Sequence, residues 1–271
     1  MPITNRLRKT LNAAANHHSR RKNDQFIAEG SRCCYEAVSR RPEWIEALFF
    51  SRSFADTVEG STIQTKAEAN GIMIEQIDDK ELQSLADTPN PQGVLAILKK
   101  PQVAPPEKIV DPFVLILDRI SEPGNMGTIL RTAWAIGLTQ VWLVKGGADP
   151  FAPKVVRAGM GAQFALSLPY VDSLANAKDR FMSLGGKQFW LTLPQADFSL
   201  FDEQNFSFEQ SAVVIGNEAN GVSDPSLGEG VTIPMPGHAE SLNAAQAATV
   251  FLCEAVRRNL FKENRDHVQH P

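Results

Sequence analysis

Three short segments rich in glycine, asparagine and small polar residues each follow an apolar run of the kind that forms a buried β-strand. They are EPGNMGTILRTA (residues 122–133), IGNEANGV (215–222) and IPMPGHAESLNAAQA (233–247). Glycine lets the backbone approach a ligand closely, and an asparagine amide offers both a donor and an acceptor. Ligands bind at the carboxyl ends of parallel strands, so we expect one site where the three segments meet.

The first segment predicts a loop followed by a helix. A Pro-Gly pair bends the chain, and Asn125 and Gly127 tolerate unusual backbone angles, which indicates a loop up to residue 127. The helix is expected over residues 128–136, with Arg131 on its first turn and directed back toward the loop. The alternative interpretation is a tight turn in which Arg131 is a surface salt-bridge partner.

The other two segments add three polar candidates. Glu218 lies between two glycines, where it could orient neighbouring loops. Ser241 and Asn243 flank the start of a final helix expected over residues 243–260, and both residue types are good N-caps. Capping explains one of the two, so the other indicates a further role.

Apolar periodicity predicts an α/β chain of two domains. Prolines and charged residues interrupt the pattern and indicate a linker over residues 101–110, between domains 1–100 and 111–271. Strands and helices alternate in the second domain, which predicts a mostly parallel sheet. Strands are expected at 45–50, 71–76 and 92–98, then at 113–117, 141–144, 167–171, 189–193, 212–215 and 231–233, with further helices at 29–39, 80–86, 173–184 and from Pro153.

The composition is that of an ordinary globular protein, with 271 residues, 43% hydrophobic residues and a net charge of −4. No apolar run approaches the roughly 20 residues of a membrane helix, and the amino terminus lacks the apolar core of a secretory signal. Three cysteines do not make a disulfide framework, and five histidines show no metal-ligand spacing. We therefore expect a protein of the reducing cytoplasm, with no membrane association and no metal site.

Basic residues concentrate near the amino terminus. Residues 1–41 contain nine basic and three acidic residues, a net charge of +6 in an otherwise acidic chain. Such a surface attracts phosphates, which makes Arg20, Arg21, Lys22 and Arg32 candidate RNA contacts. The alternative is a solvated tail in which the first 20 or so residues are disordered without RNA.

In their order and spacing, the three segments resemble the SpoU-type (TrmH-like) branch of the SPOUT RNA methyltransferases. The resemblance covers residues 111–260, and residues 24–98 also resemble the L30e-like RNA-binding domain that many members carry in front. It implies an S-adenosylmethionine-dependent homodimer that methylates a ribose 2′-hydroxyl, in ribosomal RNA first and tRNA second. It also implies a deep trefoil knot at the end of the sheet, which periodicity cannot predict.

The resemblance assigns roles to ten positions of this sequence. Methyl transfer from a sulfonium needs an in-line nucleophile, so positioning is the main task of these residues. Gly216, Ile233 and Leu242 would contact the cofactor, Met235 and Gly237 would line the same pocket, and Asn125, Arg131, Glu218, Ser241 and Asn243 match the family's functional positions.

The resemblance implies a base-like role for Arg131, which conflicts with the chemistry of guanidinium. Its proton is held up to a pKa above about 12, so binding of a phosphate and stabilisation of alkoxide charge are physically easier. Two other protein classes stay open. A non-catalytic RNA-binding or ribosome-assembly protein does not need the full set of polar residues, and a nucleotide-dependent oxidoreductase needs a glycine fingerprint that the sequence lacks.

Overall fold

A computed structural model describes residues 24–86 and 88–261 of the chain. Contacts separate the chain into two compact units. The first contains the described residues up to Gln102, together with Met126–Arg131 and Ala148–Ala165, and the rest forms the second. The break after Gln102 falls inside the predicted linker, and the domain limits at residues 100 and 111 stay a prediction.

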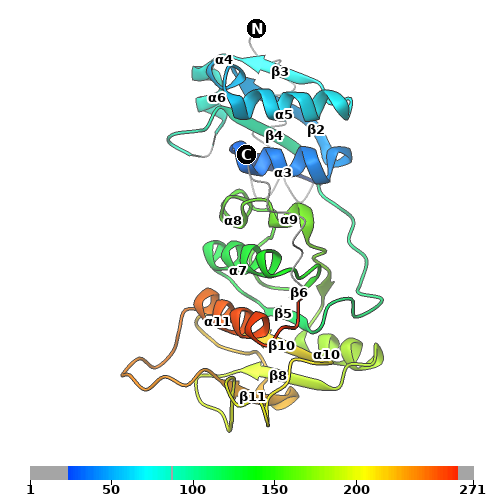
Figure 1. Ribbon diagram of the computed structural model, residues 1–271, viewed down its shortest axis with the longest axis vertical. Helices are drawn as coiled ribbons and strands as arrows, with labels where there is room; N and C mark the ends of the chain where they lie inside the picture. The colour runs from blue at the N-terminus through cyan, green and yellow to red at the C-terminus, as the bar shows by residue number, and fades with distance from the viewer. Residues whose placement is uncertain (1–23, 87, 262–271) are drawn as a thin grey trace. The chain divides into compact units, whose positions relative to one another are not determined.

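The first unit is built on a mixed β-sheet. Its strands are β1 (Gln25–Glu29), β2 (Ile45–Ser51), β3 (Ile74–Ile77) and β4 (Val94–Lys99), in the order β1-β4-β2-β3 (Figure 1). β4 is antiparallel to both of its neighbours, whereas β2 and β3 are parallel. Its helices are α3 (Ser31–Arg40), α4 (Arg52–Ala55), α5 (Val58–Ala69), α6 (Asp79–Leu85), α8 (Pro153–Gly159) and α9 (Ala162–Ala165).

The sequence pattern predicts no helix between residues 51 and 71, where α4 and α5 form. Most of α5 is polar, and its buried residues are only Gly60, Ile63 and Ala67. The apolar face is therefore too narrow for periodicity to predict a helix. An N-terminal cap and a close backbone contact stabilise the start of the helix instead. The Thr57 side chain caps it by accepting the Gly60 N–H at 2.9 Å, and a Cβ at Gly60 would meet the Phe54 carbonyl oxygen at 2.1 Å.

The second unit contains a seven-stranded sheet in the order β7-β6-β5-β10-β8-β11-β9, and every paired strand in it is parallel. This confirms the predicted α/β class with a parallel sheet, while the trefoil knot stays a prediction because strand pairing does not define how loops thread. No helix within the described ranges is both long and apolar enough to span a membrane. The elements are β5 (Val114–Asp118), the two ends of α7 (Pro123–Ile136, of which Met126–Arg131 belong to the first unit), β6 (Val141–Val144), β7 (Tyr170–Val171), α10 (Leu174–Ser183), β8 (Gln188–Thr192), β9 (Phe198–Ser199), β10 (Ser211–Ile215), β11 (Glu229–Thr232) and α11 (Ala244–Arg257).

Helices cover both faces of this sheet, so its strands are apolar on both sides. On one face, Phe181 of α10 packs 6.0 Å from the ring of Phe189 in a cluster of buried side chains. On the other face, Trp190 packs against Phe206, and Phe206 packs against Phe251 of α11. α11 is therefore fixed to the sheet by tilted and edge-to-face aromatic contacts.

The start of α7 differs from its predicted position. The helix begins at Pro123, five residues before the expected start, because proline is favoured in the first turn, where its missing N–H needs no acceptor. Asn125 therefore lies in the first turn of α7 rather than in a loop. Arg131 lies on the third turn, so its predicted place on the first turn is wrong.

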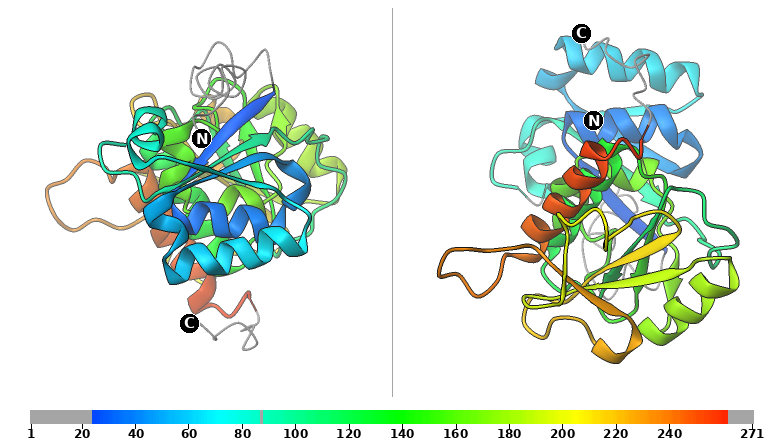
Figure 2. Two further views of the ribbon diagram at one scale, coloured as in Figure 1. Left: turned by 90° about the horizontal axis from the view of Figure 1, so that it is seen from above. Right: turned by 60° about the horizontal axis from the view of Figure 1, so that its bottom comes forward.

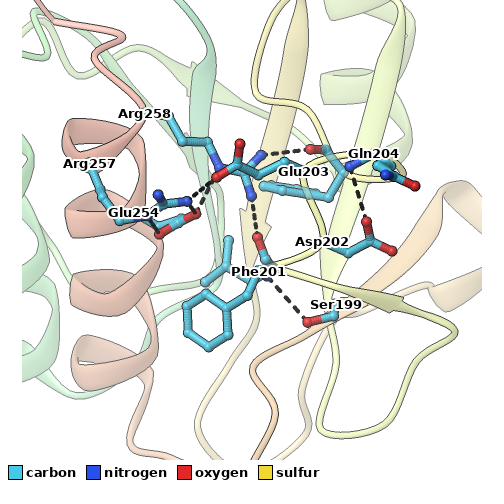
Figure 3. Close-up of polar contacts among 10 residues, drawn as sticks. Ser199, Phe201, Asp202, Glu203, Gln204, Glu254, Arg257 and Arg258 are labelled. Atoms are coloured by element: carbon cyan, nitrogen blue, oxygen red, sulfur yellow. Dashed lines mark hydrogen bonds and ion pairs between the residues drawn. The ribbon is translucent and has the colours of Figure 1, made fainter.

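A charged cluster ties the carboxyl-terminal half of α11 to the loop between β9 and β10 (Figure 3). Glu254, 5% exposed, accepts hydrogen bonds from Arg257 Nε at 2.7 Å and Arg258 Nε at 2.8 Å. Arg258 also donates to the carbonyl oxygens of Leu200 and Phe206, and Arg257 pairs with Glu203. This anchoring fixes α11 and hence the segment that precedes it.

The cluster predicts an acid-sensitive contribution to stability. The hydrogen bond from Arg257, opposed by burial and supported by Arg258, lowers the pKa of Glu254 from 4.5 to about 2. A depressed folded-state pKa stabilises the fold fully above pH 4.5 and progressively less as the pH falls toward 2. The difference in unfolding free energy between the wild type and Glu254→Gln should therefore shrink in chemical denaturation below about pH 4.5.

Two arginine variants provide the matched comparison. Arg258 is 12% exposed, so Arg258→Ala leaves a buried carboxylate short of a partner and should cost about 3 kcal/mol at neutral pH. Arg257 is 58% exposed, so Arg257→Ala should cost clearly less. Equal losses in both variants, or a pH-independent effect of Glu254→Gln, would contradict this account of the cluster.

Candidate active site

The three polar segments follow β5, β10 and β11, as the sequence predicts. β5 and β10 are hydrogen-bonded neighbours, and β8 lies between β10 and β11. The carboxyl ends of these parallel strands face one edge of the sheet, which brings their loops together. The segment between β11 and α11, drawn in orange in Figure 2, extends away from the sheet, and most of its residues are exposed.

The Glu218 carboxylate joins the loop after β10 to the turn that opens α7. Its Oε2 accepts the Ser121 N–H at 3.1 Å and the Ser121 hydroxyl at 2.9 Å. Its Oε1 accepts the Glu122 N–H at 3.2 Å and the Asn125 Nδ2 at 2.8 Å. An anion at the amino end of a helix is also favoured by the helix dipole. Glu218 therefore fixes the first turn of α7 from another part of the chain.

A second set of hydrogen bonds continues from Asn125 to the last helix. Asn125 Oδ1 accepts from Asn243 Nδ2 at 3.0 Å, and Asn243 Oδ1 accepts the N–H of Ala245 at 2.9 Å as the N-cap of α11. Each amide thus donates at one end and accepts at the other, which determines its orientation. The result is a directed chain from α11 through Asn243 and Asn125 to Glu218.

The hydrogen bonds around Glu218 determine its charge. Burial opposes ionisation, but the bonds from the Asn125 side chain, the backbone and Ser121 outweigh it and lower the pKa of Glu218 from 4.5 to about 2. The carboxylate is therefore ionised throughout the neutral range. It acts as a fixed acceptor and does not serve as a proton donor.

A cavity of about 240 Å³ opens beside this chain. Apolar residues form much of its wall, and the loops after β8, β10 and β11 contribute backbone and small polar side chains. Such a combination suits a nucleoside with a charged tail. Six of the predicted residues line it: Gly216, Glu218, Ile233, Met235, Ser241 and Leu242.

Gly216 shows why glycine is required in the cavity wall. A Cβ at this position would lie 2.5 Å from the Gly221 carbonyl carbon and the Val222 nitrogen. Any side chain would push apart the turn closed by the Asn217 and Gly221 hydrogen bonds. The backbone here packs against itself, and it presents its other side to the cavity. These residues fit the adenosine contacts that the resemblance implies for S-adenosylmethionine.

The remaining predicted residues lie outside the cavity wall. Gly237 is not among the lining residues, and a Cβ there would meet no atom within 4 Å. Arg131 is exposed on α7 and makes no hydrogen bond or ion pair within the described part of the chain. Arg32 is half-exposed on α3 and pairs with Glu36 at 2.7 Å. The other predicted RNA contacts, Arg20, Arg21 and Lys22, lie outside the described residues.

The sequence prediction missed the loop after β8, where Thr192, Leu193 and Pro194 line the cavity. The Thr192 hydroxyl donates to the Val214 carbonyl oxygen at 2.8 Å and so fastens this loop to β10. Strand order supplies the missing signal, because β8 is the neighbour of β10 and ends at the same edge. In the sequence, β9 separates β8 from β10, and both β9 and β10 separate it from β11.

The buried Cys33 is unsuited to nucleophilic chemistry, and the described residues contain no candidate metal site. Burial raises the pKa of the Cys33 thiol to about 12, which removes its nucleophilic form at neutral pH. Among the residues that the structure describes, no group of three histidine, cysteine or acidic side chains could hold a metal ion. The polar chain and the cavity are therefore the chemically equipped features of this edge.

Comparison with known proteins identifies both halves of the chain. The family model described as the SpoU rRNA Methylase family matches residues 112–253. The model described as RNA 2′-O ribose methyltransferase substrate binding matches residues 27–104.

Similar proteins match along nearly the whole chain. A Synechocystis protein named as an uncharacterized tRNA/rRNA methyltransferase is 31% identical over 261 residues, which cover 94% of this chain and 92% of that protein. A Bacillus subtilis protein named 23S rRNA (guanosine(2553)-2′-O)-methyltransferase is 30% identical over 238 residues, covering 86% of this chain and 89% of its own length.

Solved structures of methyltransferases are also similar to this chain. The SpoU methyltransferase AviRb from Streptomyces viridochromogenes, in complex with AdoMet, superposes with a TM-score of 0.79 at 27% identity, covering 95% of this chain and 99% of its own. An AdoMet-bound rRNA methyltransferase from Sinorhizobium meliloti gives a TM-score of 0.78 at 28% identity, covering 96% and 97%. The chain belongs to the SpoU rRNA methylase family, and it is an S-adenosylmethionine-dependent RNA ribose 2′-O-methyltransferase.

Proposed function

We propose that this enzyme methylates a ribose 2′-hydroxyl of ribosomal RNA as a homodimer in the cytoplasm. The observation that carries the proposal is the hydrogen-bonded chain from Asn243 through Asn125 to Glu218 beside the cavity. Relatives named for ribosomal RNA support the substrate, among them rRNA methyltransferase 3 of mouse mitochondria, 28% identical over 329 residues. Three free cysteines, at 33, 34 and 253, agree with a reducing compartment.

The polar residues divide into positioning and binding groups. When bound, S-adenosylmethionine supplies an electrophilic methyl group on a good leaving group. Glu218 holds Asn125, and Asn125 keeps one amide hydrogen and one acceptor lone pair free to orient the ribose. The Ser241 hydroxyl, which makes no hydrogen bond within the described ranges, can bind the cofactor's polar end or the ribose.

Arg131 is the group that meets developing negative charge. It is exposed, without a partner in the described residues, and it lies two turns after Asn125 on the rigid helix α7. A guanidinium that binds the phosphate next to the reactive ribose would also stabilise the alkoxide as its proton leaves to water. This role needs no deprotonation of arginine.

The exposed apolar surface of α11 supports the homodimer. Val256 is 45% exposed, and Cys253 on the preceding turn is also exposed. Leu242, 36% exposed, adds apolar surface next to the site. A partner that covers this face would also remove water from the polar chain and strengthen it.

Mapping of 2′-O-methylation in total RNA tests the substrate together with Arg131. Cells that lack the protein should lack one ribosomal RNA methylation, and wild-type protein should restore it. In single-turnover assays with saturating RNA, Arg131→Ala should be on the order of 100-fold slower, and Arg131→Lys intermediate because it keeps the charge without the planar fork. Loss of a tRNA methylation alone would overturn the substrate, and near-wild-type rates in both variants would make Arg131 a surface residue.

Glu218→Gln tests the positioning role of the carboxylate. Both oxygens of Glu218 accept hydrogen bonds, so either orientation of a glutamine amide points its N–H groups at other donors. The maximum rate should fall roughly 10- to 100-fold, since small misplacements are costly. With a pKa of about 2, the wild-type rate should show no ionisation of Glu218 between about pH 5 and 9. Glu240→Gln, an exposed carboxylate in the loop before α11, is the control and should keep full activity.

Two charge insertions test the homodimer. Val256→Glu on α11 should convert the dimer to monomer in light scattering coupled to gel filtration, because a carboxylate would be buried at the interface. Met182→Glu on α10 is the matched control, since Met182 is 44% and Val256 45% exposed. A monomeric wild type, or a Val256→Glu protein that stays dimeric, would contradict the proposal.

A further inference from the structure

The turn between β5 and α7 contains a backbone conformation that arginine rarely adopts. Arg119 has a φ of +57°, in the left-handed region where a side chain strains the backbone. Glycine or asparagine would adopt it more easily. Asp24, Met160, Gln210 and Asn259 share this backbone region, so a role for Arg119 is argued from the contacts of its side chain.

Four contacts fix Arg119 in place. Its Nε lies 3.3 Å from Oδ1 of Asp118, a carboxylate that is fully buried. The Asn217 side chain donates to the Arg119 carbonyl oxygen at 2.8 Å. Gly146 and Gly147 pack against its side chain and backbone, and a Cβ at Gly147 would meet the Ile120 carbonyl oxygen at 2.7 Å. The stem of the arginine is thus held rigidly.

The guanidinium head is free, in contrast to the stem. The side chain is 40% exposed, and within the described ranges its only ionic partner is Asp118, through Nε. The two terminal nitrogens of the fork therefore make no bond to the described chain. Guanidinium is suited to bidentate binding of phosphate, and a preorganised head loses little freedom on binding.

The location of Arg119 decides between cofactor and RNA as its ligand. Asn217, to which its backbone is bonded, lines the cofactor cavity, but Arg119 itself does not. Asn217 therefore lies between Arg119 and the cavity. Arg119 belongs to the same group of loops as Ser121 and Glu218. Asn217 separates Arg119 from a ligand inside the cavity. It does not separate Arg119 from a polyanion that lies over the edge of the loops.

We propose that Arg119 binds an RNA phosphate at the rim of the active site. This inference rests on the proposed function. Arg119 acts in addition to Arg131 and holds the RNA strand rather than the reacting atoms. The buried Asp118 carboxylate forms an ion pair with Nε at 3.3 Å without a hydrogen bond between the two atoms, and the left-handed backbone at Arg119 directs the guanidinium to the rim.

The test uses single-turnover methyl transfer to protein-free ribosomal RNA from cells that lack the protein. Arg119→Asn removes the charge while tolerating the left-handed backbone. The RNA concentration for half-maximal rate should rise roughly five- to tenfold, and its dependence on salt should lose about one phosphate contact. The rate at saturating RNA and the affinity for S-adenosylmethionine should stay within twofold of wild type. Arg119→Lys should recover part of the RNA affinity.

Controls separate binding from folding. Lys187→Asn makes the same charge change just before β8, at the opposite edge of the sheet, and should leave the salt dependence unchanged. Because Arg119→Asn leaves Asp118 buried without a counter-ion, the double variant Asp118→Asn with Arg119→Asn removes both charges and should show the same RNA defect.

The outcomes distinguish this inference from the proposed function. A wild type that transfers methyl groups while Arg119→Asn keeps the wild-type salt dependence would overturn the phosphate contact alone. Loss of cofactor affinity or of thermal stability in the double variant, with unchanged RNA dependence, would also overturn it and make Arg119 a structural residue. A wild type that transfers no methyl group to ribosomal RNA would overturn the proposed substrate, and this inference with it.

Discussion

The site depends on one interaction, the binding of the Glu218 carboxylate at the amino end of α7. Segments almost one hundred residues apart meet there, because Ser121, Glu122 and Asn125 all donate to a side chain that follows β10. An exposed carboxylate of this kind contributes little to global stability. Its effect is geometric, since it sets the direction of the Asn125 amide, and through Asn125 that of Asn243.

The packing of the sheet makes this interaction reproducible. α11 is fixed at its far end by Glu254 and Arg258 and along its length by Phe251 against Phe206, so the position of its N-cap Asn243 is not free to drift. β5 and β10 are bonded side by side, which places the start of α7 next to the loop that carries Glu218. Errors in either packing surface would separate donors from acceptors that lie 2.8 to 3.2 Å apart.

Sequence patterns predicted most of the scaffold and part of the site, for identifiable reasons. The strands of the parallel sheet are nearly continuous apolar runs, so β5, β6 and β10 were predictable within one residue or two. α5 was not, because polar residues dominate it and Thr57 and Gly60 specify it through contacts that have no periodicity. α7 was placed too late because the Pro-Gly pair was interpreted as a turn, although proline is also a good first residue of a helix.

Some residues that line the cavity could be predicted from the sequence, and others could not. Gly216, Ile233 and Leu242 could be assigned because their motif is local and specific, and they line the wall. Thr192 could not, since only the order β10-β8-β11 brings the end of β8 to the site, and strand order is a three-dimensional property. The left-handed backbone at Arg119 could not be predicted either, because a sequence indicates this conformation only where glycine or asparagine occupies the position.

The turn that contains Arg119 combines a fully buried carboxyl group with a left-handed backbone. Asp118 is 0% exposed, and Arg119 has a positive φ. Both costs would fall if asparagine replaced the pair, so fold stability alone does not explain them. Hydrogen bonds offset part of each cost, from the Ser223 N–H to Asp118 and from the Asn217 side chain to the Arg119 carbonyl oxygen. The active-site loops thus hold this turn in place, as the proposed phosphate contact of Arg119 requires.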